Sequence, residues 1–239
     1  MVEMGHLERV RVVEDKGPKL GAQATTEVFG TDRDSIFPLQ AAIGYDIAQS
    51  LFVGPDNLVV EGSSDFTYLT VVSDYLATQK RARLDPRWRL LPAGGSSNIP
   101  AFVALIGPHL DVTVLVDAGT DGMQRLTNMT KRGLLQGQRL ITITEITGSS
   151  NADIEDLFTV ADYLKLYNGA MGKPFIAENK LPPGDRIVKR IARKIGKDFD
   201  HGLPADHLLR NRDTLCPEME EETLTRFERL IHRINQTLS

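Results

Sequence analysis

Residues 57–65, with the sequence NLVVEGSSD, join a short apolar run to the beginning of a helical pattern. The apolar run at 58–60 stops at Glu61-Gly62. From Asp65 to Lys80 apolar residues recur every three or four positions, which is the spacing of an amphipathic helix. This segment is therefore expected to form one strand–helix unit of an α/β sheet.

The same alternation continues downstream. Further strands are predicted at 88–91, 112–116 and 140–144, with helices at 99–106 and 123–135 between them. The almost wholly apolar run at 112–116 is typical of a central parallel strand. From residue 150 onward the pattern is helical, with helices predicted at 152–167, 185–195, 204–210 and 218–237. Before residue 55 a helix is predicted at 37–53 and a strand at 10–13, and 17–30 reads as irregular.

The bulk composition limits the possible partners. The chain has 239 residues, 41% of them hydrophobic and 25% charged, as in ordinary globular proteins. A net charge of −4 means that contact with nucleic acid must come from local basic clusters. The one cysteine, Cys216, cannot form an internal disulfide, which fits a reducing compartment. Without a membrane-spanning run or a secretory signal, the sequence predicts a cytoplasmic protein.

Acidic residues follow the predicted strands where each strand ends. Glu61 ends the first strand, Asp65 comes four positions later, and Asp117 ends the third. Asp153, Glu155 and Asp156 follow the loop after the fourth strand. Ligands bind at the carboxyl ends of parallel strands, and clustered carboxylates suit Mg²⁺ or Mn²⁺. Singly, Asp65 and Asp153 are also explained as residues that begin helices, because carboxylates complement the helix dipole.

The segment 60–65 (VEGSSD) resembles the VEGxSD opening of a Toprim domain. The resemblance extends to the C-terminal Toprim region of the OLD (overcoming lysogenisation defect) family of nucleases, class 2, over about residues 35–210. The stretches that carry it are 45–62, 92–100 (PAGGSSNIP), 114–117, 153–158 (DIEDLF) and 199–205 (FDHGLPA).

The resemblance implies a Toprim-type, Rossmann-like parallel sheet flanked by helices, with additional helices in the C-terminal part. Residues 1–55 would be a connector from an N-terminal ABC-type ATPase region, since this chain has no GxxxxGK[ST] phosphate loop. Residues 56–168 would be the Toprim core and 169–239 a helical extension packed on it. A homodimer is expected by the same resemblance.

The resemblance also implies a site for one or two Mg²⁺ or Mn²⁺ ions. Its ligands would be Glu61, Asp65, Asp117, Glu155 and Asp156, with Asp153 as a further candidate. Two departures from the family pattern concern catalysis. The family's Asp-x-Asp after the third strand is Asp117-Ala118-Gly119 here, with Asp121 two positions late, and Leu203 stands where relatives carry a lysine. Lys189 is taken as the catalytic cation beside Glu61 and Asp117, with Lys180 and His201 as alternatives.

The predicted helix at 185–195 and the residues after it are strongly basic. Six cations share one face of this segment: Arg186, Lys189, Arg190, Arg193, Lys194 and Lys197. Isoleucines at 187, 191 and 195 form another face. A basic face opposite an apolar one suits contact with a DNA backbone, although a solvated surface helix has the same pattern.

These observations together predict a divalent-metal-dependent DNA endonuclease or nickase. Two other interpretations remain open. A weakened Toprim module would bind DNA or an ATPase partner without cleaving. An enzyme of the same fold with other chemistry, a phosphatase or a primase-like nucleotidyl transferase, would act on other phosphates; with one cysteine, a cysteine-based zinc module is excluded.

Overall fold

A computed structural model describes residues 12–15, 21–25, 54–107, 110–119, 122–172 and 175–238. The helix predicted at 37–53 and Asp121 lie outside these residues. Strand β1 (Val12–Asp15) pairs antiparallel with β2 (Ala22–Thr25). The prediction of an irregular segment at 17–30 was therefore wrong for β2, whose four residues (AQAT) include none of the large apolar or aromatic residues that mark a strand.

The predicted α/β sheet is confirmed. Strands β3 (Asp56–Val60), β4 (Arg89–Pro92), β5 (Asp111–Val116) and β6 (Leu140–Thr142) form one parallel sheet in the order β4-β3-β5-β6. β3 and β5 are the central pair, and every residue of β3 is buried. Their carboxyl ends, where Glu61 and Asp117 follow, therefore lie side by side.

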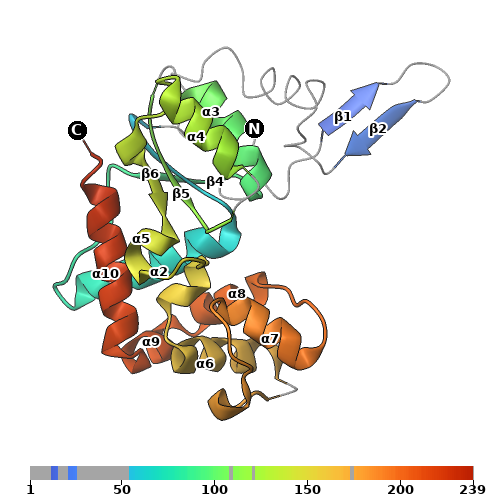
Figure 1. Cartoon of the computed structure of the whole chain (residues 1–239), viewed down its shortest axis with the longest axis vertical. Helices are drawn as coiled ribbons and strands as arrows, with labels where there is room; N and C mark the ends of the chain where they lie inside the picture. The colour runs from blue at the N-terminus through green and yellow to red at the C-terminus, as the bar shows by residue number, and fades with distance from the viewer. Residues whose placement is uncertain are drawn as a thin grey trace.

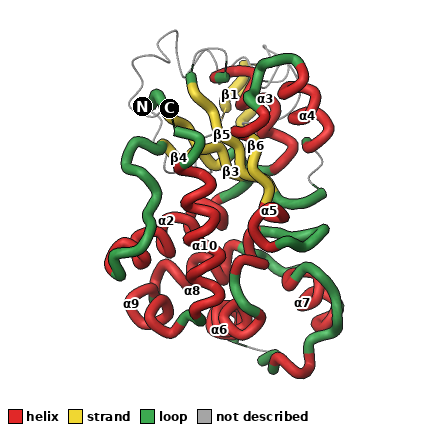
Figure 2. Tube along the Cα trace, turned by 60° about the vertical axis from the view of Figure 1, so that its left-hand side comes forward, coloured by secondary structure: helices red, strands yellow, loops and turns green. Residues whose placement is uncertain are grey.

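Helices cover both faces of the sheet. Alternate side chains of a strand point to opposite faces. Val59 and Val114 accordingly pack in one core with α3 (Ile99–Ile106) and α4 (Met123–Lys131). Leu58 and Leu115 pack in the other core with α2 (Ser63–Thr78) and α10 (Glu221–Asn235). Figure 2 shows α3 and α4 on one side of the strands and α2 and α10 on the other.

A second group of helices lies beyond the carboxyl ends of the strands (Figure 1). It comprises α5 (Ile143–Thr147), α6 (Val160–Met171), α7 (Ile187–Ile195), α8 (Gly202–Arg210) and α9 (Arg212–Leu215). Short 3₁₀ turns connect the elements: η2 (Ser96–Asn98), η3 (Gly137–Arg139), η4 (Ile154–Leu157), η5 (Glu178–Lys180) and η6 (Cys216–Glu218). Because α8 packs against both α6 and α2, this group is continuous with the core of the sheet.

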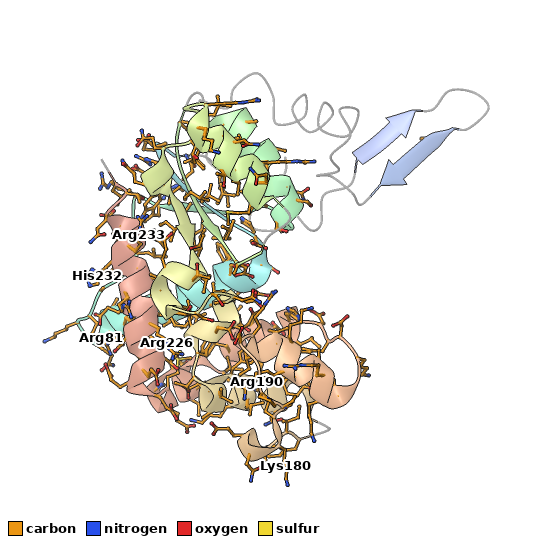
Figure 3. The ribbon with its side chains drawn as sticks, viewed as in Figure 1. Arg81, Lys180, Arg190, Arg226, His232 and Arg233 are labelled. Carbon is orange, nitrogen blue, oxygen red and sulfur yellow. The ribbon has the colours of Figure 1, made fainter. Side chains whose placement is uncertain are left out.

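Helix α10 returns from this group to the sheet (Figure 1). Its apolar stripe, including Phe227 and Ile234, is fully buried. Just after its end, the hydroxyl of Thr237 lies 2.8 Å from that of Thr113 on β5. Arg81, labelled beside α10 in Figure 3, pairs with Glu228 of this helix at 2.7 Å. Residues far apart in sequence thus close one face of the sheet.

Several predicted bounds differ from the structure; the helix predicted at 123–135, for example, ends at Lys131. The strand predicted at 140–144 ends at Thr142, because Thr142 and Glu145 form a capping box that begins α5. The helix predicted at 152–167 is divided into η4 and α6, because the Thr159 side chain accepts a hydrogen bond from the amide of Asp162 and caps a new helix. In the described part of the chain, no helix has the length and apolar character needed to cross a membrane.

Candidate metal centre

Glu61 and Asp117 stand at the ends of the two central strands and contact each other. The backbone amide of Asp117 donates to Glu61 Oε1 at 3.0 Å. The Glu61 carbonyl accepts from the amide of Gly95 at 2.8 Å, which holds the glycine-serine loop after β4 against this end of the sheet. Gly95 has a φ of 131°, a conformation that favours glycine. Glu61 and Asp117 thus lie together at one edge of the sheet, as the sequence predicted.

Asp65 lies in the first turn of α2 and is buried, with 6% of its surface exposed. Its Oδ2 accepts a hydrogen bond from the amide of Gly62 at 2.9 Å, so it helps to begin the helix. Burial, reinforced by the charge of Glu61, nevertheless raises its pKa from 3.8 to about 7. A carboxyl group whose only role was to begin a helix would be stabilised as the anion, and its pKa would be lowered. The raised pKa of Asp65 therefore indicates a role in addition to capping.

Turn η4 brings the third acidic segment to the same place. The amide of Ile154 donates to Asp117 Oδ1 at 2.9 Å, which fastens η4 to the end of β5. Glu155 is only 4% exposed, and burial together with the charge of Asp65 raises its pKa to about 8. Burial and then the charges of Asp65 and Glu155 raise the pKa of Asp117 to about 10. Each carboxyl group thus disfavours ionisation of the others.

Glu61, Asp65, Asp117 and Glu155 form what we call the carboxyl cluster. Its donors are hard oxygen atoms, and the raised pKa values of Asp65, Asp117 and Glu155 show that negative charge is not neutralised there. Both properties suit Mg²⁺ or Mn²⁺. Among the described residues, no three acidic, histidine or cysteine side chains already surround one point as a coordination shell. The residues therefore fit a divalent ion in kind, and binding would draw the oxygens together.

Asp153 and Asp156 have other partners. Arg186 donates from Nε to Asp153 Oδ2 at 2.6 Å, and its Nη2 forms an ion pair with Oδ1. Asp156 accepts from the amide of Asp153 and from that of Ile187, each at 2.8 Å. These contacts join η4 to the beginning of α7, and we call them the Arg186 clasp. Burial raises the pKa of Asp156 to about 6.

The basic residues of α7 fall into two groups. Arg190 Nε donates to the Pro182 carbonyl at 2.8 Å, and Arg193 Nη2 donates to the Pro183 carbonyl at 2.7 Å. Both arginines thus brace the turn that precedes the helix. The side chains of Lys189, Lys194 and Lys197 are exposed. The lysines are therefore better placed than the arginines to meet a large ligand.

His201 lies close to the carboxyl cluster. Its Nδ1 is 3.9 Å from Glu155 Oε1, and its ring packs on Phe199 with centroids 4.9 Å apart. Burial lowers the pKa of His201, and the positive charge of Lys189 contributes to the same shift. Lys180 lies at the far end of the helical group in Figure 3. Of the three cations considered from sequence, Lys189 and His201 are near the cluster.

Leu203, the position at which the family resemblance leads us to expect a lysine, is 44% exposed. Sequence reasoning missed the Arg186 clasp entirely. Arg186 was predicted to contact DNA, and no local pattern links it to Asp153, which is 33 positions away. The one hint in the sequence was that Asp153 and Arg186 both belong to segments expected near the carboxyl end of the sheet.

Comparisons with known proteins find similarity at low sequence identity. Neither a protein-family model nor a curated protein matches the chain. Two solved structures of the C-terminal region of the OLD protein of Xanthomonas campestris pv. campestris are similar to it. One is 17% identical with a TM-score of 0.43 and covers 75% of this chain and 94% of that one. The other is 15% identical with a TM-score of 0.45, covering 76% and 98%.

Proposed function

We propose that this chain is a divalent-metal-dependent endonuclease or nickase that hydrolyses phosphodiester bonds in DNA. The observation that carries the proposal is the carboxyl cluster, in which acids from β3, α2, β5 and η4 meet at the carboxyl end of the central strands. The resemblance of its first segment to a Toprim opening supports the same chemistry.

In this proposal Glu61, Asp65, Asp117 and Glu155 hold Mg²⁺ or Mn²⁺. When bound, such an ion supplies Lewis acidity and an activated water for attack on phosphorus. Glu61 and Asp117 orient the reacting centre, because each is fixed by a backbone hydrogen bond at the end of a rigid strand. Lys189, near the Glu155 corner, contributes positive charge toward the phosphate.

The exposed lysines of α7 and the residues after it would hold the DNA backbone. Lys189, Lys194 and Lys197 contact phosphates directly, while Arg190 and Arg193 shape the surface through the turn at Pro182 and Pro183. The further partners implied by the resemblance are an ABC-type ATPase region and a second copy of the chain.

Cleavage of supercoiled plasmid tests this function. We expect nicked and linear products with Mg²⁺ or Mn²⁺ and none with EDTA. Glu61→Gln and Asp117→Asn should abolish cleavage, while Asp74→Asn, which neutralises an exposed carboxylate on α2, should cleave like wild type. Metal-independent cleavage, or full activity of Asp117→Asn, would contradict the proposal.

The second candidate is a weakened Toprim module that binds DNA without cutting it. The Asp117-Ala118-Gly119 sequence and the exposed Leu203 favour it, because both replace polar groups expected near the centre. A wild-type protein that is inert with every metal but shifts DNA in a gel would establish this alternative. Hydrolysis of a small phosphomonoester would instead indicate a phosphatase.

A further inference from the structure

The positively charged side chain of Arg186 lies among the acidic residues of the candidate metal centre. Arg186, immediately before α7, presents the flat fork of its guanidinium to Asp153 and engages both carboxylate oxygens. The Asp153 side chain is 4% exposed and that of Arg186 is 27% exposed, so the pair is largely shielded from water. Such two-pronged pairing is the strongest form of arginine–carboxylate contact.

Asp156 is also fully engaged. Its two oxygens accept separate backbone hydrogen bonds at 2.8 Å, from Asp153 and from Ile187. Three of the four side-chain oxygens of Asp153 and Asp156 thus accept a hydrogen bond, and the fourth, Asp153 Oδ1, forms the ion pair with Arg186. Asp153 and Asp156, two of the six acids expected to bind metal, are therefore held by contacts with the beginning of α7 and within η4.

Two-ion centres place their cations about 3.5–4 Å apart and need enough carboxylate oxygens for both. Here the oxygens of Asp153 and Asp156, the acids that flank Glu155 in sequence, belong to the clasp, and Arg186 is paired directly with Asp153. We infer that Arg186 takes the place of a second metal ion, so that the chain binds one divalent ion and Arg186 balances the remaining charge. This inference rests on the proposed function and makes Arg186 a positioning residue rather than a contact for DNA.

No other described cation of α7 has this placement. Arg190 and Arg193 donate to the carbonyls of Pro182 and Pro183, and Lys189 is exposed. The role is therefore specific to the side chain at position 186. Removing it should leave Asp153 as a buried carboxylate that is available to a second ion.

Counting bound Mn²⁺ tests the inference without any measurement of activity. The purified full chain is titrated with Mn²⁺, and the free ion is followed by electron paramagnetic resonance. We expect one ion per chain for wild type and two for Arg186→Gln. Arg193→Gln removes an equal charge from the same helix and should still bind one. Two ions on wild type, or one ion on a folded Arg186→Gln, would overturn the inference.

A second variant covers the case in which Arg186→Gln does not fold. Arg186→Lys keeps the charge but loses the fork, so we expect one ion and cleavage slowed about 10-fold or more. Two ions on Arg186→Lys would also overturn the inference. The two failures give different results. If the proposed function is wrong, wild type binds no Mn²⁺. If only the inference about Arg186 is wrong, wild type binds two ions and still cleaves DNA in a metal-dependent way.

Discussion

Glu155→Gln should stabilise the metal-free protein at neutral and alkaline pH. Glu155 has a folded-state pKa of about 8 against an ordinary value of 4.5, because it is buried beside other acids. The folded state therefore holds the proton more tightly than the unfolded state. Its contribution to stability is complete below pH 4.5 and is lost as the pH rises towards 8.

The expected magnitude follows from about 1.4 kcal/mol for each pKa unit. Between pH 4.5 and pH 7.5, the wild-type protein should lose roughly 4 kcal/mol of unfolding free energy through this one group. A neutral glutamine of the same shape avoids that loss. For a chain of this size, the Tm of the variant at pH 7.5 should then exceed that of wild type by roughly 10 °C.

Calorimetry in EDTA at a series of pH values from 4.5 to 8 measures the effect. Asp162→Asn is the matched control, because Asp162 is equally buried but accepts hydrogen bonds from Glu220 N at 2.8 Å and Thr223 Oγ1 at 2.6 Å. That substitution should lower the Tm, since it removes the negative charge that strengthens these two hydrogen bonds to Asp162 Oδ2. The reasoning about Glu155 fails if Glu155→Gln is no more stable than wild type at pH 7.5, or if its advantage is the same at pH 4.5.

Three further predictions concern metal binding and helix α10. Mn²⁺ should raise the wild-type Tm more at pH 8 than at pH 5, since protons compete for the carboxyl cluster; an equal shift at both pH values in a thermal-shift assay would count against a metal there. Thr237→Val should cost about 1–3 kcal/mol in urea unfolding by leaving the buried Thr113 hydroxyl without its partner, and adding Thr113→Val should cost less than the sum of the single changes. Asn235→Ala removes bonds to Trp88 Nε1, Asp85 N and Arg83 O, so it should lower stability by roughly 3 kcal/mol. It should also red-shift the fluorescence of Trp88, the chain's one tryptophan, and an unchanged spectrum would show that α10 does not cover that ring.

The strands and the acids that follow them were predictable because the relevant signals are local. The apolar run before Glu61 and the one before Asp117 each mark a buried strand by themselves, and parallel strands bring their carboxyl ends together. The division between η4 and α6 was missed because capping by Thr159 outweighed a continuous helical periodicity. Whether an acid faces a metal or another partner depends on residues far away in sequence, such as Arg186 for Asp153. No periodicity contains that information.

The return of α10 to the sheet has a consequence for biosynthesis. A ribosome completes all four strands of the parallel sheet before it reaches Phe227 and Ile234. Until those side chains emerge, the face that contains Leu58 and Leu115 lacks part of its cover and presents apolar surface to the cell. Complete burial of this face therefore requires α10, whose residues are synthesised after every strand of the sheet.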